Sequence, residues 1–393
     1  MASQQPEPYS NPSSEESPFA GSITESKTPS LPPRLLFWLK VAGIIAALYF
    51  FIVGVGGMGH AFKLFGAEFA ERVLAATANP FTGLFIGILA TSLVQSSSTS
   101  TSIIVGMVAG GALSPEGAIF MIMGANIGTS ITSILVSLGH IHRPQELRRA
   151  FSAASVHCFF NLACVAILFP LELATGFLRR TATISAGIFE GAGGMRLSNP
   201  LKAMTEPTIE AIAWLVQGHP IVMLVVTVAL TYGMLILIVK LLRSLVLKKL
   251  EYFFDTHLFS TWQRAMLFGM VLTFAVQTSS VPTALVVPLA GAGVLKLIQV
   301  YPYCLGSNMG TTMTAMLAAL ATGSEIAVIA AFAHLLFNVV GILIIWPVPA
   351  IRNVPLRVAE RMGELAFRNR LVPVAALLLI YFLIPALIVF IVR

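Results

Sequence analysis

Two runs of small polar side chains carry the chemistry that this sequence offers. The first run, Gln95–Ser102, contains only amide and hydroxyl side chains and lies between the apolar segments 81–94 and 103–112. The second run, Gln277–Ser280, also lies between two apolar segments. A hydroxyl or amide that is buried without a partner costs about 2–7 kcal/mol. We therefore expect both runs to line a cavity or a ligand site rather than a lipid-facing surface.

A second pair of motifs places an asparagine between two glycines. These motifs are GANIGTS at 124–130 and GSNMGT at 306–311, each within an apolar segment. Glycines on both sides of an asparagine favour a local break in a helix, and such a break frees backbone carbonyls to bind a cation. The sequence thus predicts a broken helix in each half of the chain.

A histidine and an asparagine, four residues apart, follow each of these motifs. The pairs are His157 with Asn161 and His334 with Asn338. Residues at this spacing share one face of a helix. We interpret the histidines as structural residues, hydrogen-bonded to a broken helix, rather than as proton relays.

The motifs recur at a nearly constant spacing. The glutamine, the first glycine, the asparagine and the Gly-Thr pair of the second half each lie 182 residues after their counterparts, and the His and Asn pair lies 177 residues after its counterpart. Each half holds three expected spans, an odd number, so the two halves would enter the membrane from opposite sides. This is the inverted-repeat plan of secondary transporters, which bind substrate near the midplane.

The composition indicates a membrane protein. The 393 residues are 56% hydrophobic and 10% charged, against about 45–50% and about 25% in soluble domains. Segments long enough to span, at about 17–25 residues, are 35–57, 115–138, 147–170, 220–242, 297–320, 326–346 and 371–392. The regions 80–113 and 265–294 are interrupted by the polar runs. We predict an all-α polytopic membrane protein of two inverted-topology repeats, each with a re-entrant helical hairpin and a broken transmembrane helix.

The chain divides into six predicted parts. They are a disordered cytoplasmic tail (1–33), a first inverted repeat (34–175), an external connector (176–218), a second inverted repeat (219–348), a cytoplasmic interfacial helix (349–370) and a final transmembrane helix (371–393). Two further interfacial helices are expected at 60–78 and 243–262. The tail is rich in Ser, Pro and Glu and lacks the basic start and apolar core of a signal peptide.

Basic residues suggest the orientation. Lys and Arg gather in 140–149, 240–264 and 352–370. By the positive-inside rule these segments and the N-terminus face the cytoplasm, and we prefer this explanation to nucleic-acid binding. The three cysteines lie in apolar segments and predict no disulfide framework.

The two polar runs could bind an anion together with a hard cation. A helix N-terminus carries about +0.5 elementary charge, so second hairpin arms that begin near Ser98 and Ser280 could hold an anion between them. Half-helix C-termini, unwound carbonyls and hydroxyls suit Na⁺. No Arg or Lys lies in the runs, which indicates that cations neutralise the anion during transit.

Other interpretations of the polar runs are less favourable. Single hydroxyls often join membrane helices, but two matched clusters are poorly explained in that way. Ser97 and His157 could form a nucleophile and base, yet no orienting carboxylate, metal-ligand cluster, GxSxG elbow or phosphate loop accompanies them. We therefore predict that the protein is not an enzyme. A channel remains the alternative class, because hydroxyl rings can also line a pore.

The chain resembles the type II sodium/phosphate cotransporter family from about residue 35 onward. The resemblance is most specific in LVQSSSTSTSIIV, IMGANIGTSITSILVSL, RRAFSAASVHCFFN, VQTSSVPTALVVPL, LGSNMGTTMTAMLAALA and GILIIWPVPAIRNVPLRVA. It implies uptake of inorganic phosphate driven by the Na⁺ gradient, with the hairpins exposing one site to each side in turn. Other oxyanions, or a dicarboxylate, remain alternative substrates.

The resemblance also implies site residues. Phosphate contacts would fall on Gln95, Ser96, Ser97, Ser98, Gln277, Thr278, Ser279 and Ser280. Sodium ligands would fall among Ser279, Thr311, Thr314, Ser307 and Asn308, with Asn126 and Thr129 as counterparts in the first repeat. No cofactor is expected other than Na⁺ as the coupling ion, and no transition metal.

Three departures from the family pattern carry further expectations. Cys158 stands where electrogenic members have an aspartate, so the resemblance implies electroneutral transport with two Na⁺ per divalent phosphate. Thr278 replaces the usual serine, which could narrow the site. The segment 171–218 is shorter than the central loop of animal members, and the chain ends before a final span, which would leave the C-terminus outside. We expect a multi-pass protein of a bacterial inner membrane, in contact with the lipid bilayer and compatible with a homodimer.

Overall fold

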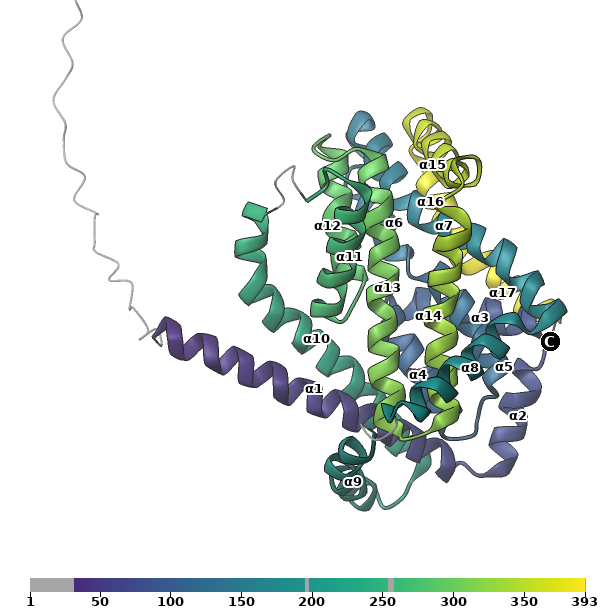
Figure 1. Ribbon diagram of the computed structural model, residues 1–393. Helices are drawn as coiled ribbons and strands as arrows, with labels where there is room; N and C mark the ends of the chain where they lie inside the picture. The colour runs from purple at the N-terminus through teal and green to yellow at the C-terminus, as the bar shows by residue number, and fades with distance from the viewer. Residues whose placement is uncertain (1–31, 195–197, 254–257, 393) are drawn as a thin grey trace, which may run out of the picture.

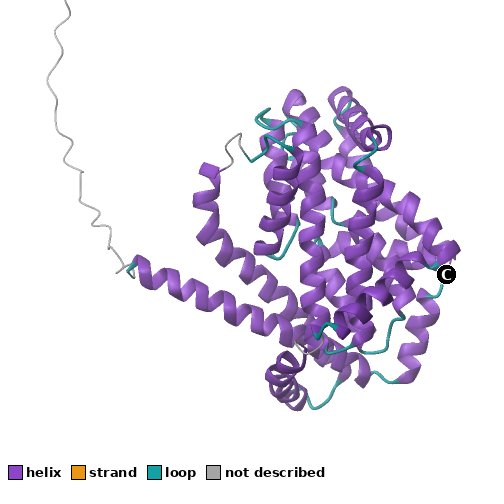
Figure 2. Cartoon of the chain, in the orientation of Figure 1, coloured by secondary structure: helices purple, strands orange, loops and turns teal. Residues whose placement is uncertain are grey.

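The computed structural model describes residues 32–194, 198–253 and 258–392, and these form helices joined by short connections, with no strand among them (Figure 2). The helices up to residue 191 are α1 (Pro33–Leu64), α2 (Ala67–Thr77), α3 (Pro80–Val94), α4 (Ser97–Ala109), α5 (Pro115–Gly128), α6 (Ile131–Leu138), α7 (Pro144–Thr175) and α8 (Phe177–Gly191). Those that follow are α9 (Ser198–Leu215), α10 (Pro220–Phe253), α11 (Trp262–Val276), α12 (Ser280–Gly291), α13 (Leu297–Thr322), α14 (Glu325–Ile345), α15 (Pro349–Arg368), α16 (Leu371–Leu378), η2 (Leu379–Leu383) and α17 (Ile384–Val392). Nearly all of the expected tail lies outside the described residues.

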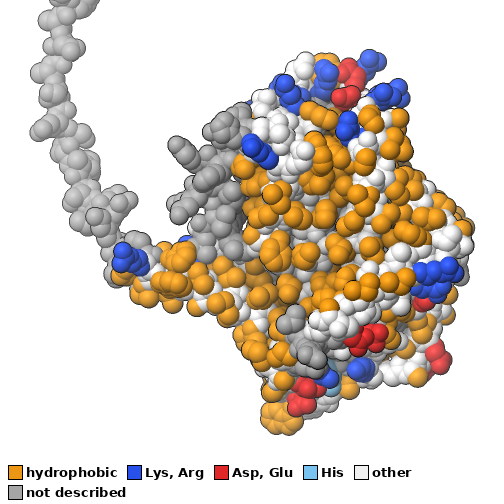
Figure 3. Space-filling model, viewed as in Figure 1, with side chains coloured by type: hydrophobic (Ala, Val, Ile, Leu, Met, Phe, Trp, Pro, Cys, Tyr) orange, Lys and Arg blue, Asp and Glu red, His pale blue; other side chains and the backbone are white. Residues whose placement is uncertain are grey.

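Within the described residues, six helices are long and apolar enough to cross a membrane. They cover 34–64, 115–138, 144–175, 220–238, 325–345 and 371–392. At a rise of about 1.5 Å per residue, about 20 residues cross a hydrocarbon core of about 30 Å. Figure 3 shows hydrophobic side chains over the middle of the molecule, with Lys and Arg gathered at the end where α15 lies. The protein is a polytopic all-α membrane protein.

One expected span, 297–320, forms helix α13 but is not among the six. The helix is 26 residues long, yet it carries polar side chains such as Gln299, Ser307 and Asn308. Most of its middle is buried, and it packs against α11 and α14. Because protein rather than lipid surrounds α13 (Figure 1), its polar groups find partners inside the molecule.

Both polar runs form the turn of a helix-turn-helix pair, as predicted. Helices α3 and α4 meet at Gln95, and helices α11 and α12 meet at Gln277. The two glutamines have left-handed backbones, with φ of 56° and 58°. Each arm has between 12 and 15 residues, or about 18–23 Å of helix, which is shorter than the bilayer core. Helix α3 also bends by 100° from α2.

The glycines of the GxNxG motifs serve close helix packing. A Cβ atom at Gly124 would overlap the carbonyl oxygen of Leu84 on α3, and one at Gly306 would overlap the carbonyl oxygen of Met266 on α11. Gly87 and Gly269 meet the opposite backbones in the same way. All of these contacts repeat at the 182-residue spacing, so α3 packs on α5 as α11 packs on α13.

The predicted broken helices are therefore only half correct. In the first repeat, the helix is interrupted at Thr129 and Ser130, where Ser130 N donates to Ile127 O at 3.3 Å in a tighter turn. In the second repeat, α13 continues through its motif without a break, so that expectation was wrong. The glycines allow the helices to approach, and the backbone hydrogen bonds remain in place.

The two expected interfacial helices also differ from prediction. In the first repeat, α1 extends to Leu64, and α2 begins only after Gly66, whose φ of 80° ends the preceding helix. In the second repeat, the same helix continues from the span to Phe253 as α10, because no glycine or proline interrupts 242–253. The separate helix expected at 243–262 is thus wrong up to 253, and residues 254–257 lie outside the described residues.

Candidate functional site

The two hairpin turns meet inside the protein. Ser97 Oγ and Ser279 Oγ, which occupy equivalent positions of the repeat, lie 3.4 Å apart and both residues are buried. The Ser280 hydroxyl donates to the carbonyl oxygen of Gln95 at 3.0 Å. Helix α4 begins at Ser97 and helix α12 at Ser280. The structure thus brings together the N-termini of the two second arms, whose first amides have no partner within their own helices.

The first hairpin contains buried hydroxyl groups that have no partner. The side chain of Ser96 caps α4, accepting from Thr99 N at 3.3 Å and from Thr99 Oγ1 at 2.9 Å. By contrast, the buried oxygens of Thr91, Ser92, Ser98 and Ser100 have no hydrogen-bond partner. Buried polar groups are nearly always satisfied, and exceptions often mark a ligand or water site.

The second hairpin is satisfied by the protein itself. Thr314 Oγ1 donates to Gln277 Oε1 at 3.0 Å, and Gln277 Nε2 donates to the carbonyl oxygen of Phe274 at 2.5 Å. Thr273 and Ser307 share a hydrogen bond of 2.6 Å. Gln277 is 9% exposed, whereas its counterpart Gln95 is an exposed residue. Thr278, the departure from the family pattern, is also buried at this turn.

The candidate sodium ligands separate into two groups. Ser279, Thr314 and the C-terminal end of α11 lie around the second turn. The side chains of Thr311 and Thr129 instead donate to carbonyl oxygens one helical turn earlier in their own helices, at 3.1 Å and 2.8 Å. In the described part of the chain, no three His, Cys, Asp or Glu side chains form a metal-binding group. A cation here would bind hydroxyl and carbonyl oxygens, which suit a hard ion.

The asparagines and histidines join the two repeats. Asn308 Nδ2 donates to Asn161 Oδ1 at 2.8 Å, and its Oδ1 accepts from His157 Nε2 at 2.6 Å. Asn338 Nδ2 donates to Asn126 Oδ1 at 3.3 Å. Asn161 pairs with Asn308 and its counterpart Asn338 pairs with Asn126, so each repeat supplies the same amide to the other. All of these side chains are buried.

A residue that the sequence did not single out lies beside Cys158. Tyr381, in the η2 segment of the last helix, is 1% exposed and donates to Ser130 Oγ at 3.0 Å. The Cys158 thiol is within hydrogen-bonding reach of both Tyr381 and Ser130. Ser130 lies at the interruption between α5 and α6. The π-helical turn at 379–383 was the one signal that could have drawn attention to Tyr381, since such turns are frequent at functional sites, and it is not visible in the sequence.

The fold and the site define a class. An all-α membrane protein in which two helix N-termini converge on buried hydroxyls, with hairpin arms too short to span, has the architecture of a secondary transporter. It is a transporter and not an enzyme.

The chain belongs to the Na⁺/Pi-cotransporter family, whose profile matches residues 50–189 and 229–346. It is 35% identical over 430 residues to sodium-dependent phosphate transport protein 2A of Ovis aries, covering 89% of this chain and 67% of the relative. It is 33% identical over 439 residues to sodium-dependent phosphate transport protein 2B of Homo sapiens, covering 87% and 64%. The chain thus spans about two thirds of these relatives. No solved structure matches it.

Proposed function

We propose that this protein takes up inorganic phosphate by symport with Na⁺, at the site where the two hairpin turns meet. The observation that carries the proposal is the contact between Ser97 and Ser279, equivalent residues at the N-termini of α4 and α12. Phosphate would accept from the amides of both helix ends and from the free hydroxyl of Ser98. The relatives named above are sodium-dependent phosphate transporters, which supports this choice among oxyanions.

Sodium would bind close to the phosphate. The C-terminal end of α11, Ser279 and Thr314 offer carbonyl and hydroxyl oxygens around Gln277, and a half-helix C-terminus carries partial negative charge. Because no Lys or Arg lies in either polar run, bound Na⁺ would balance the phosphate charge during transport.

Unequal hairpins support an alternating-access cycle. The turn at Gln95 is exposed and the turn at Gln277 is buried, although the two sequences match. In the opposite state, the second turn would open and the first would close. We place the protein in a bacterial cell membrane with its basic α15 end facing the cytoplasm.

Uptake into proteoliposomes tests the central proposal. Labelled phosphate should enter only with an inward Na⁺ gradient, and Gln95→Ala and Gln277→Ala should each lower uptake at least tenfold. Gln217→Ala is the matched control, because Gln217 is also an exposed glutamine with a left-handed backbone, φ 53°, at the end of a helix. Uptake that ignores Na⁺, or wild-type rates in both hairpin variants, would remove the proposal. Competition by arsenate but not by succinate separates phosphate from dicarboxylate transport.

We also propose that transport is electroneutral, because Cys158 supplies no carboxylate. Current recording on proteoliposomes should show no phosphate-induced current for the wild type. Cys158→Asp would place a carboxylate beside Ser130 and Tyr381, where it could hold one more Na⁺, and this variant should generate current. Cys164→Ala is the control, since Cys164 is buried elsewhere on α7. A wild-type current that rises in proportion to uptake would contradict the assignment.

A further inference from the structure

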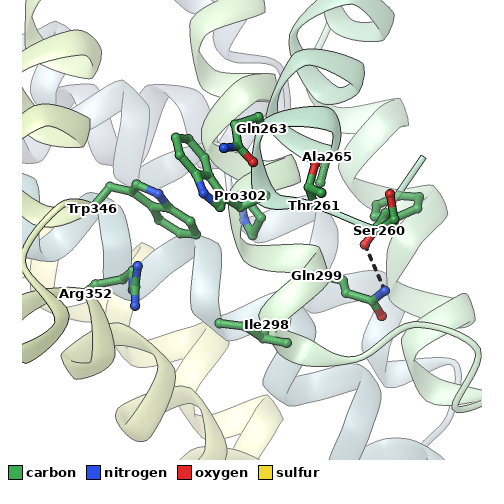
Figure 4. Close-up of a pocket in the computed structure, with 11 residues that line it drawn as sticks. Ser260, Thr261, Gln263, Ala265, Ile298, Gln299, Pro302, Trp346 and Arg352 are labelled. Carbon is green, nitrogen blue, oxygen red and sulfur yellow. Dashed lines mark hydrogen bonds between the residues drawn. The ribbon is translucent and has the colours of Figure 1, made fainter. Parts of the chain in front are cut away.

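A cavity far along the chain from the hairpin turns combines aromatic walls with one cation. Its volume is about 470 Å³, and it lies between the start of α11, the start of α13 and the junction of α14 with α15. Figure 4 shows Trp346 and Arg352 on one side of the cavity, with Ile298 and Gln299 facing them. No Asp or Glu is among the described residues that line it.

Arg352 is the charged group of this cavity, and its Nε is unsatisfied. The guanidinium lies over the Trp346 ring, with Cζ 5.2 Å from the ring centroid. Its Nε is buried and has no hydrogen-bond partner, and Arg352 forms no ion pair within the described chain. The cation–π contact does not replace the hydrogen bond that a buried N–H group requires. An anionic oxygen in the cavity would supply it.

The surrounding backbone adds to the positive potential. Arg352 lies in the first turn of α15, where its backbone N donates to the carbonyl oxygen of Val348 at 2.8 Å. A helix N-terminus attracts negative charge. Pro347 and Pro349 flank Val348, and their fixed φ angles hold the start of α15 against Trp346.

The mouth of the cavity is apolar. Trp262 and Ile298 line the cavity and are 45% and 49% exposed. The Trp262 ring packs against the Trp346 ring with centroids 5.4 Å apart. Tryptophans of this kind are typical of the membrane–water interface. A ligand with a charged head and an apolar tail therefore fits better than a compact hydrated ion.

We propose that this cavity binds the phosphate-bearing headgroup of an anionic phospholipid, with its acyl chains leaving between Trp262 and Ile298. Arg352 pairs with the phosphate, and Trp346 covers the guanidinium from the other side. The lipid contacts the first arm of the second hairpin through Trp262 and the amphipathic helix α15 through Arg352. It therefore stabilises the packing of α11 against α15.

Lipid titration of the purified full chain in neutral detergent tests this site. Phosphatidylglycerol should raise the melting temperature more than phosphatidylcholine does, and phosphatidylglycerol with brominated acyl chains should quench tryptophan fluorescence. Arg352→Gln should weaken the apparent affinity for phosphatidylglycerol about tenfold, the loss expected for one charge-assisted hydrogen bond. Arg357→Gln, an exposed arginine on the same helix, should behave as the wild type.

The same titration separates lipid from free phosphate. The effect of inorganic phosphate on the melting temperature should be the same in the wild type and in Arg352→Gln. If phosphate acts only when Arg352 is present, the cavity is a free-anion site and the lipid assignment is overturned. Equal phosphatidylglycerol affinity in the wild type and Arg352→Gln, or equal effects of phosphatidylcholine, would also overturn it. Arg352→Lys should recover part of the affinity, because it keeps the charge but loses the planar fork.

Discussion

The first and second hairpins share a sequence pattern and differ in how their polar groups are satisfied. Around Gln95, the hydroxyls of Thr91 and Ser98 are buried without partners. Around Gln277, Thr273 pairs with Ser307 and Ser280 pairs with the Gln95 carbonyl. The difference follows partly from one substitution within the repeat, because the counterpart of Ser307 is Ala125. Matched motifs therefore do not imply matched states, and the contrast assigns an open half and a closed half to the site.

The largest effect is expected where the two halves are most alike. Gly124→Ala and Gly306→Ala each place a Cβ against a carbonyl oxygen of the neighbouring helix. Each should lower the free energy of unfolding by about 3 kcal/mol, the upper part of the range for overpacking, measured from thermal melting in detergent. Gly233→Ala on α10 is the control, since no atom lies within 4 Å of its Cβ position. A severe loss in only one of the two variants would break the equivalence of the packing.

Cysteine labelling measures the open and closed turns directly. Gln95→Cys should react with a membrane-impermeant maleimide at least tenfold faster than Gln277→Cys in the absence of substrate, because only Gln95 is exposed. The native cysteines are buried, so the wild type gives the blank. Na⁺ with phosphate should reduce the difference between the two rates. Equal rates without substrate would show that the two turns do not differ in access.

A serine pair separates ligand binding from structure. Ser98→Ala should raise the phosphate concentration for half-maximal uptake about tenfold and leave the melting temperature unchanged or higher, since it removes an unsatisfied hydroxyl. Ser280→Ala breaks the bond to the Gln95 carbonyl and should cost about 1 kcal/mol of stability. If Ser98→Ala lowered stability without changing uptake, its hydroxyl would belong to the fold instead of the ligand site.

The smallest effect is expected from exchanging one residue between the repeats. Ser307→Ala leaves Thr273 without its partner and should cost about 1–2 kcal/mol. Ala125→Ser offers Thr91 the bond that Thr273 has, and should add about 1 kcal/mol or less. Differential scanning calorimetry of both variants checks the sign. Stabilisation by Ser307→Ala, or a large loss in Ala125→Ser, would show that Ala125 and Ser307 do not occupy equivalent environments.

Local features of the site were predictable from the sequence. The hairpin turns at Gln95 and Gln277 follow from polar residues between apolar segments, since hydrocarbon disfavours such residues. The internal repeat follows from counting. What the glycines do was not predictable, because Gly124 and Gly306 could either loosen a helix or admit a neighbour, and only the packed partner decides.

Contacts between distant segments were also beyond the sequence. His157 bonds to Asn308 and Tyr381 approaches Cys158 across more than 150 and 200 residues. Such pairs depend on how helices dock, which periodicity within one helix does not determine. The continuity of α10 past residue 242 was missed for a simpler reason: the repeat suggested a break that no local residue enforces.

The contact between Ser97 and Ser279 has a geometric consequence. Two copies of one motif can touch through the same atom only at the pseudo-two-fold axis that relates them. Exchanging the conformations of the two halves leaves a point on that axis where it was. A substrate bound between these hydroxyls would therefore stay nearly still while the protein rearranges around it, and its crossing would be a change in which compartment it faces.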